Sequence, residues 1–193
     1  MALLARKQRD LDEELRLWRE LKAQYSKFPH FYINIIKLLI QNKNFREANV
    51  EATALNINFP QSYYGLLYLA TIAFMEDDFQ QACVYSEKLI SIHPDIVDGW
   101  SLFFKSKNRY FRNFQKSEVF SLNKRFHDNE KILTCIADEA LFYDEYDIAI
   151  DFLSKLRCLE GCNKFEYAKM KITIYSHDDS HPFGHPNSQT FGQ

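Results

Sequence analysis

The chain has 193 residues, of which 46% are hydrophobic and 16% aromatic, and its formal net charge is −2. This near-neutral balance gives no overall electrostatic attraction to nucleic acid, so we expect no nucleic-acid partner. Phenylalanine (17) and tyrosine (11) outnumber glycine (5) and proline (5), which favours long packed helices over a turn-rich β fold. No apolar run is long enough to cross a bilayer, so we expect no membrane insertion.

The predicted elements are helices throughout. Apolar residues at three- and four-residue spacing form one stripe on a charged helix over 3–26, namely Leu4, Leu11, Leu15, Trp18, Leu21 and Tyr25. Helix pairs with short polar turns follow, at 31–42 with 45–57, 61–76 with 79–92, 96–110 with 114–125, and 129–143 with 146–158. Turns this short make the two members of each pair antiparallel. A last helix is expected over 163–175, and a flexible tail over 176–193.

A repeat of about 34 residues orders these pairs. Similar five-residue stretches open the second helices, at 44–48, 78–82, 113–117 and 145–149. The small residues that close them are Ala48, Ala82, Ser117 and Ala149, with spacings of 34 (82 − 48), 35 (117 − 82) and 32 (149 − 117). A period in this range indicates stacked helical hairpins, in which each unit covers an apolar face of the next. Alanine at these positions lets the two helices of a hairpin approach closely.

The second unit carries the clearest family pattern. Its first helix has large and small residues at the positions used by tetratricopeptide repeats, and its second helix ends on a proline; the matching residues are Leu66, Leu69, Ala70, Ala73, Ala82, Leu89 and Pro94. The third unit departs from the pattern at Lys105 and Ser117. The chain resembles this family over about 28–160. The resemblance implies an all-α, right-handed solenoid of antiparallel hairpins.

The implied organisation has about four units with flanking helices. The repeats are expected at 28–60, 61–94, 95–128 and 129–162. An N-terminal helix within 1–27 would pack on the array, and the helix at 163–175 would be a cap or a partial repeat.

No sequence motif indicates catalysis. The chain has no glycine-rich phosphate loop, no Gly-x-Ser-x-Gly and no His-Glu-x-x-His. Acidic residues at the hairpin turns are explained as solvated turn residues. His177, His181 and His185 are four residues apart, but Pro182 and Gly184 prevent a regular helix there. We therefore expect no enzyme activity and no cofactor.

The four cysteines favour a reducing compartment over a disulfide framework. Cys83 and Cys135 fall inside helical patterns, where a thiol acts as a small apolar group. Cys158 and Cys162 could supply two zinc ligands, but a zinc site needs about four and no second pair lies nearby. The N-terminus turns charged after four apolar residues, which is too short for a signal peptide. We expect a cytoplasmic protein with free thiols and no metal.

In tetratricopeptide proteins the first helices of successive units line a concave groove. The resemblance implies that partner-binding residues lie on the equivalent helices here, namely Asn34, Lys37, Tyr64, Tyr68, Thr71, Phe103, Arg109 and Tyr110. Only Asn34 and Lys37 match the set with which some members clamp a peptide's terminal carboxylate, so we expect no such clamp. An aromatic-rich groove suits a peptide or a partner helix. Burial of the same rings between units is the alternative interpretation.

Three functional hypotheses follow. The first is a non-enzymatic protein-interaction scaffold that binds a peptide or partner helix in the groove. The second is an accessory or regulatory region of a larger polysaccharide-modifying enzyme, because the repeat style is also similar to helical segments attached to bacterial glycosyltransferases. The third is self-association through exposed end faces, which would give a homo-oligomer.

Overall fold

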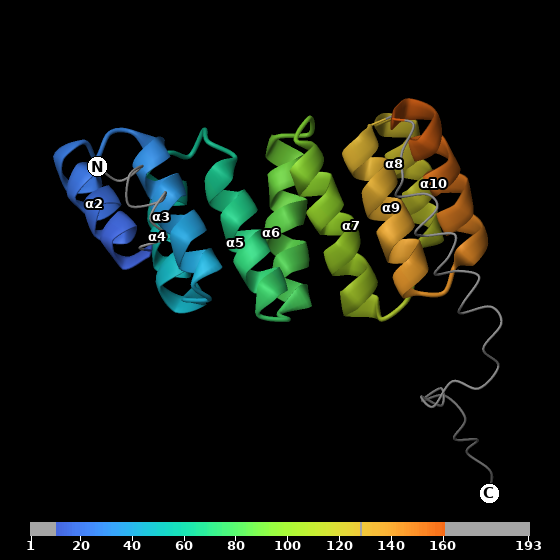
Figure 1. The fold of residues 1–193 in the computed structure, drawn as a ribbon, viewed down its shortest axis with the longest axis horizontal. Coiled ribbons are helices and arrows are strands. Elements are labelled where there is room, and N and C mark those ends of the chain that lie inside the picture. Colours follow the sequence, from blue (N-terminus) through green and yellow to red (C-terminus); the bar gives the residue numbers. More distant parts are fainter. Residues whose placement is uncertain (1–10, 128, 161–193) are drawn as a thin grey trace, which may run out of the picture. The chain divides into compact units, whose positions relative to one another are not determined.

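The structure is a computed structural model that describes residues 11–127 and 129–160, with backbone only for 157–160. Regular structure in this part of the chain is α-helical throughout, which confirms the all-α helical-repeat prediction (Figure 1). The helices are α2 (Leu11–Gln24), α3 (Pro29–Gln41), α4 (Phe45–Asn58), α5 (Tyr64–Met75), α6 (Phe79–Ile92), α7 (Val97–Phe111), α8 (Lys116–Arg125), α9 (Glu130–Phe142) and α10 (Tyr146–Glu160). None of these helices is long and apolar enough to cross a bilayer.

The chain forms two compact units, Met1–His127 and Asp128–Gln193. In the first, α2 packs on α3, and the hairpins α3–α4, α5–α6 and α7–α8 follow; in the second, α9 packs on α10. The predicted helix at 163–175, the predicted tail at 176–193 and the first part of the predicted N-terminal helix lie outside the described residues.

Each hairpin turn uses a residue in the left-handed region of backbone space. These residues are Lys43, Asp77, Arg112 and Asp144, with φ between 53° and 59°. The next residue donates its N–H to a carbonyl five positions back, in the pairs Asn44 to Leu39, Asp78 to Ala73, Asn113 to Asn108 and Glu145 to Ala140, at 2.8–3.2 Å. This hydrogen bond ends the first helix and reverses the chain.

In the first two hairpins the second helix begins directly after this turn. Asn44 and Asp78 are the N-cap residues of α4 and α6, and their side-chain oxygens accept from the backbone N–H groups of Glu47 and Gln81. Such a cap satisfies one of the donors that a helix start leaves without a partner. The turn and the cap together fix where each second helix starts.

Small residues then bring the helices of a hairpin together, as the sequence predicts. Ala48, Ala82 and Ala149 are all fully buried. In the first unit, large aliphatic side chains that are at most 1% exposed complete the interior, including Ile35, Ile36, Leu39, Leu55 and Ile72. Burial of one such side chain contributes about 1.5–3 kcal/mol to the free energy of folding.

The third hairpin corrects the predicted register. The repeat equates Ser117 with the buried alanines, but Ser117 is exposed in the first turn of α8. Two extra turn residues move the start of this helix, so that Gln115 is its N-cap and Val119 lies four positions later, as Ala82 does after Asp78. Val119 is 8% exposed and takes the interior place.

The N-terminal helix packs on the first hairpin through part of the predicted stripe. Leu15 and Trp18 are buried, and the Trp18 indole N–H donates to Glu14 at 3.1 Å. Tyr25 was wrongly included in the stripe, because it lies beyond the helix end and is 50% exposed. Lys22 of α2 forms an ion pair with Glu51 of α4 at 2.5 Å.

Candidate functional site

The first helices of the three hairpins in the first unit lie next to one another. Helix α5 contacts both α3 and α7. Side chains 34 residues apart therefore align across the three helices, in rows that we call together the first-helix face. The rows are His30, Tyr64 and Asp98; Asn34, Tyr68 and Leu102; Lys37, Thr71 and Lys105; and Gln41, Met75 and Arg109.

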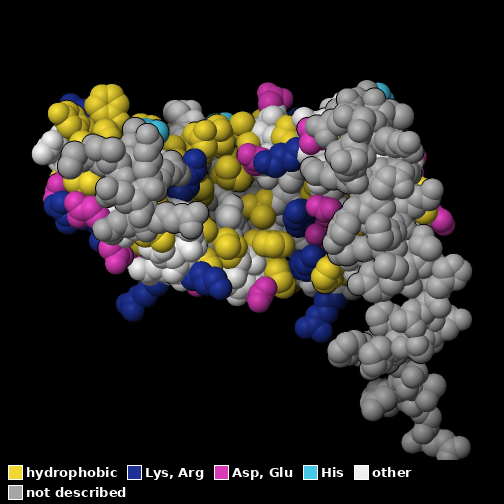
Figure 2. Space-filling model, in the orientation of Figure 1, with side chains coloured by type: hydrophobic (Ala, Val, Ile, Leu, Met, Phe, Trp, Pro, Cys, Tyr) yellow, Lys and Arg dark blue, Asp and Glu magenta, His cyan; other side chains and the backbone are white. Residues whose placement is uncertain are grey.

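Within each helix these positions follow a spacing of four, three and four, which keeps them on one side of the helix. They are mostly exposed or half-buried, and Tyr68, at 9% exposure, is the most enclosed. One face of the unit is visible in Figure 2, where hydrophobic side chains, a class that includes tyrosine, gather over α5 and basic side chains lie over α7.

Three tyrosines at the start of α5 form a stacked group, which we call the tyrosine cluster: Tyr63, Tyr64 and Tyr68. The rings of Tyr63 and Tyr64 are 4.1 Å apart with an interplanar angle of 28°, and those of Tyr64 and Tyr68 are 6.2 Å apart at 19°. The imidazole of His93 contacts Tyr63 edge-on at 6.2 Å. The three stacked rings form a broad aromatic platform.

The phenols of Tyr63 and Tyr68 stay protonated well above neutral pH. Burial raises the pKa of Tyr68 to about 12, and Tyr64, Tyr63 and Asp98 add to the shift. A hydrogen-bonding interaction with Tyr64 is the largest cause that raises the pKa of Tyr63 to about 12, followed by burial and the nearby charges. Asp98 acts on both groups, so the start of α7 lies close to the cluster. At neutral pH the Tyr63 and Tyr68 hydroxyls are therefore available as hydrogen-bond donors.

On α3 the predicted residues lie beside the cluster row. The amide nitrogen of Asn34 is 2.9 Å from the ring Nε2 of His30 and also donates to the His30 carbonyl at 2.9 Å. Lys37 is exposed. On α5 the Thr71 hydroxyl donates to the Leu67 carbonyl at 2.8 Å, which leaves its oxygen lone pairs for an incoming donor.

Basic side chains gather toward the C-terminal ends of these helices. Lys37 and Lys105 share a row, and Arg109 occupies the next row with Gln41 and Met75. The Nη1 atom of Arg109 is buried, while the residue as a whole is half-exposed. The first-helix face thus changes along the helices from aromatic to cationic.

The other two predicted residues have different neighbours. The Phe103 ring contacts Trp100 at 6.4 Å and lies 5.4 Å from the Lys107 ammonium, which bonds Glu118 of α8 at 2.5 Å. Phe103 is therefore on the side of α7 that faces its hairpin partner. Tyr110 is 47% exposed and stands against Phe111, with ring centroids 5.0 Å apart.

Six residues of the first-helix face lie outside the predicted partner-binding set, namely His30, Gln41, Met75, Asp98, Leu102 and Lys105. Asp98 and Lys105 lie 34 residues after Tyr64 and Thr71 (64 + 34 and 71 + 34). The period was thus sufficient to find them. On α7 the prediction did include Arg109, which the period requires (75 + 34 = 109), but it added Phe103 and Tyr110, each one position beyond a residue of the face.

The described residues offer little for metal or thiol chemistry. No group of three or more His, Cys, Asp or Glu side chains in residues 11–127 and 129–156 is arranged to hold a metal ion. Burial raises the pKa of Cys83 to about 11, so this thiol is a poor nucleophile at neutral pH. The side chains of Cys158 and Cys162, and the three histidines of the tail, lie outside the described residues.

Comparison with known proteins gives the fold. No protein-family model matches the chain, and no curated protein matches its sequence. Among solved structures, a double mutant of MamA superposes with a TM-score of 0.61 and 10% identity, over 92% of this chain and 93% of that one. YrrB, described as a TPR protein with an unusual peptide-binding site, superposes with a TM-score of 0.58 and 10% identity, over 88% of each chain. The chain therefore has a fold similar to that of tetratricopeptide-repeat proteins.

Proposed function

We propose that the chain is a non-enzymatic protein-interaction module that binds an extended peptide or a partner helix on the first-helix face. The observation that carries this proposal is the alignment of α3, α5 and α7, which brings tyrosine, asparagine and lysine side chains from three repeats onto one surface. The peptide-binding site named for YrrB lies in a protein of similar fold and supports the same class of partner.

The dimensions of the face suit a short peptide. Packed helices are about 8–10 Å apart, so three adjacent helices span roughly 20 Å between the outer axes. An extended chain advances about 3.3 Å per residue, so roughly six residues cross this distance. A partner helix of the same length would present about four turns.

The aromatic side chains of the face would supply contact area, and its polar and charged side chains would set the position of the bound segment. Tyr64 and Tyr68 supply flat rings with few rotatable bonds, which bury a large area at low entropic cost. Their hydroxyls and the Asn34 amide can pair with the backbone of the bound segment. Lys37 and Lys105 favour a segment with acidic side chains near the cationic rows.

The test compares a variant on this face with a matched variant elsewhere. Peptides selected by display on the wild-type protein are titrated by calorimetry against Tyr64→Ala/Lys37→Ala. Loss of one aromatic anchor and one charge should weaken binding at least about tenfold. The control is Val50→Ala/Lys88→Ala, which truncates exposed side chains on the second helices α4 and α6.

Circular dichroism should give the same helix content for all three proteins, because each substituted side chain is exposed or half-buried. If the Tyr64/Lys37 variant binds the selected peptides as tightly as the wild type, the first-helix face is not the binding surface. Equal weakening by the control variant would lead to the same conclusion.

A further inference from the structure

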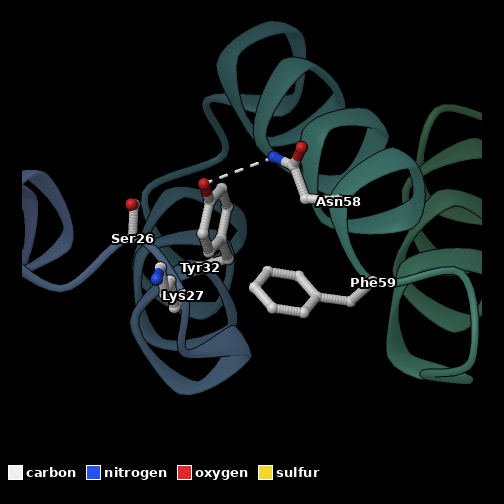
Figure 3. Close-up of a pocket in the computed structure, with 5 residues that line it drawn as sticks. All are labelled: Ser26, Lys27, Tyr32, Asn58 and Phe59. Carbon is white, nitrogen blue, oxygen red and sulfur yellow. Dashed lines mark hydrogen bonds between the residues drawn. The ribbon is translucent and has the colours of Figure 1, made fainter.

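A pocket of about 420 Å³ lies at the end of the first hairpin, away from the first-helix face. Its walls come from three segments, with Ser26 and Lys27 from the α2–α3 connection, Tyr32 from α3, and Asn58 and Phe59 from the end of α4 (Figure 3). Tyr32 and Asn34 are two positions apart on α3, so their side chains point roughly 200° apart. The volume falls in the range of about 300–1,000 Å³ that is usual for small-molecule sites.

One wall of the pocket is aromatic and held in place. Tyr32 is 5% exposed, and Phe59 meets its ring edge-on at 5.7 Å and 72°. The amide nitrogen of Asn58 donates to the Tyr32 hydroxyl at 3.4 Å, the bond drawn in Figure 3. The Lys22 ammonium lies 4.4 Å from the centre of the Tyr32 ring. These contacts hold the Tyr32 ring, which forms the floor of the pocket. The Phe59 ring is half-buried, so a ligand can cover its remaining exposed surface.

The other wall is polar and carries one positive charge. Lys22 is paired with Glu51 at 2.5 Å, so its charge is already balanced. Lys27 is exposed and forms no ion pair with any residue in the described ranges. Ser26 next to it offers a hydroxyl, and Figure 3 shows the Lys27 nitrogen and the Ser26 oxygen on the same side of Tyr32. The charge left over in the pocket favours an anion.

We propose that this pocket binds a small ring compound that carries one carboxylate or phosphate group. The ring would lie against Phe59, where the apolar faces of both rings leave water. The anionic oxygens would accept hydrogen bonds from the Lys27 ammonium and the Ser26 hydroxyl, which are the charge-assisted kind. The Tyr32 hydroxyl accepts from Asn58 and can donate its own proton to a further oxygen of the ligand.

The proposal is tested on the full chain by nuclear magnetic resonance. Phenyl phosphate and benzoate are titrated separately, and the backbone amide signals of the pocket residues are followed. Both probes should shift the signals of Ser26, Lys27, Asn58 and Phe59 with saturation. Lys27→Gln should lower the affinity for both probes about tenfold, the usual effect of losing one charge-assisted hydrogen bond. Lys88→Gln, which removes an exposed charge on α6, should leave both affinities unchanged.

Two further probes separate the parts of the proposed ligand. Benzyl alcohol has the ring without the charge, and inorganic phosphate has the charge without the ring; each should bind at least about tenfold more weakly than phenyl phosphate. Inorganic phosphate with the affinity of phenyl phosphate would overturn the proposal, because the aromatic wall would then contribute nothing. Absence of saturable shifts, or equal affinity of the Lys27→Gln variant, would overturn it as well. Peptide binding to the first-helix face should be unaffected by Lys27→Gln, so the two proposals fail separately.

Discussion

The hairpins α5–α6 and α7–α8 begin alike and end differently. Both first helices have a glycine at the same repeat position, Gly65 and Gly99, and both are followed by a turn with a left-handed residue. After Asp77 the next residue caps α6, whereas after Arg112 two more residues pass before Gln115 caps α8. The repeat thus tolerates extra residues at a hairpin turn when the interior is rebuilt to match.

The rebuilt interior of α7–α8 has three parts. Phe114 lies in the longer turn and packs edge-on against Phe104, with ring centroids 5.7 Å apart. Phe104 itself stands one period after Ala70, so a large ring replaces a small residue in the interior (70 + 34 = 104). The third part is Asn108, whose side chain is fully buried and accepts from the Gln115 N–H at 3.0 Å. The buried Asn108 amide thus holds the start of α8, whereas the exposed Asp78 side chain holds the start of α6.

The two glycines give the largest expected effect. A Cβ at Gly65 would come within 2.6 Å of the Asn56 Cα, a backbone atom of α4, whereas one at Gly99 would meet the Leu89 side chain at 2.9 Å. Gly65→Ala should therefore lower the free energy of unfolding by about 3 kcal/mol, the upper end for overpacking.

Gly99→Ala should cost less than about 1 kcal/mol, because a side-chain tip can move and alanine is the better helix former. Urea denaturation of both variants measures the difference. Equal losses would show that α4–α5 and α6–α7 are packed at the same distance.

The register of α8 is tested by a second pair. Ala82→Leu overfills a fully buried position and should cost about 2 kcal/mol. Ser117→Leu, at the position that the sequence repeat equates with it, should stay within about 0.5 kcal/mol, because Ser117 is exposed. Thermal denaturation of the two variants suffices, and a comparable fall in the melting temperature for Ser117→Leu would contradict the shifted register.

Removal of the buried amide should have a somewhat smaller effect. Asn108→Ala leaves the Gln115 N–H without its side-chain acceptor and should lower stability by about 1.5 kcal/mol. Hydrogen exchange at the Gln115 amide should accelerate more than at the Gln81 amide, whose acceptor on Asp78 is untouched. Unchanged exchange at Gln115 would mean that the turn does not depend on Asn108.

The smallest effect concerns the tyrosine cluster, which α5 has and α7 lacks. The pKa of Tyr68 is raised from 10.0 to about 12, so the folded state favours the neutral phenol. Its contribution to stability is complete below pH 10 and is lost as the pH rises toward 12. In a spectroscopic titration of tyrosinate, Tyr68→Phe should remove a component with a midpoint near 12. Loss of a component near 10 instead would show that Tyr68 is not enclosed.

The fold was predictable because alanine, proline and aromatic residues recur at a fixed distance in the first two units. Ala48, Ala82 and Ala149 all have the predicted interior place. Ser117 was misplaced because the two additional turn residues are compensated by a short α8, so the total length of the repeat hides the shift. The shift is visible in the structure from the Gln115 cap and the burial of Val119, and the buried contact of the Asn108 side chain with the turn accompanies it. A single sequence carries no signal for that contact.

Those residues of the candidate site that keep the 34-residue spacing could be predicted from the sequence. Predicted residues that depart from this spacing lie outside the site. Asn34, Lys37, Tyr64, Tyr68 and Thr71 all belong to the first-helix face, because the first two units keep the spacing of 34 throughout their first helices. The pocket beside Phe59 had no signal in the sequence at all. It forms between two connections that are distant along the chain, and only packing brings Lys27 and Asn58 to the same pocket.

The left-handed residues at the hairpin turns have a consequence for engineering. Lys43 and Arg112 hold this conformation with full side chains, at a cost of about 1 kcal/mol each relative to glycine. Glycine at these two exposed corners would relax the backbone without altering either proposed binding surface. Lys43→Gly and Arg112→Gly should therefore raise the thermal stability of the chain.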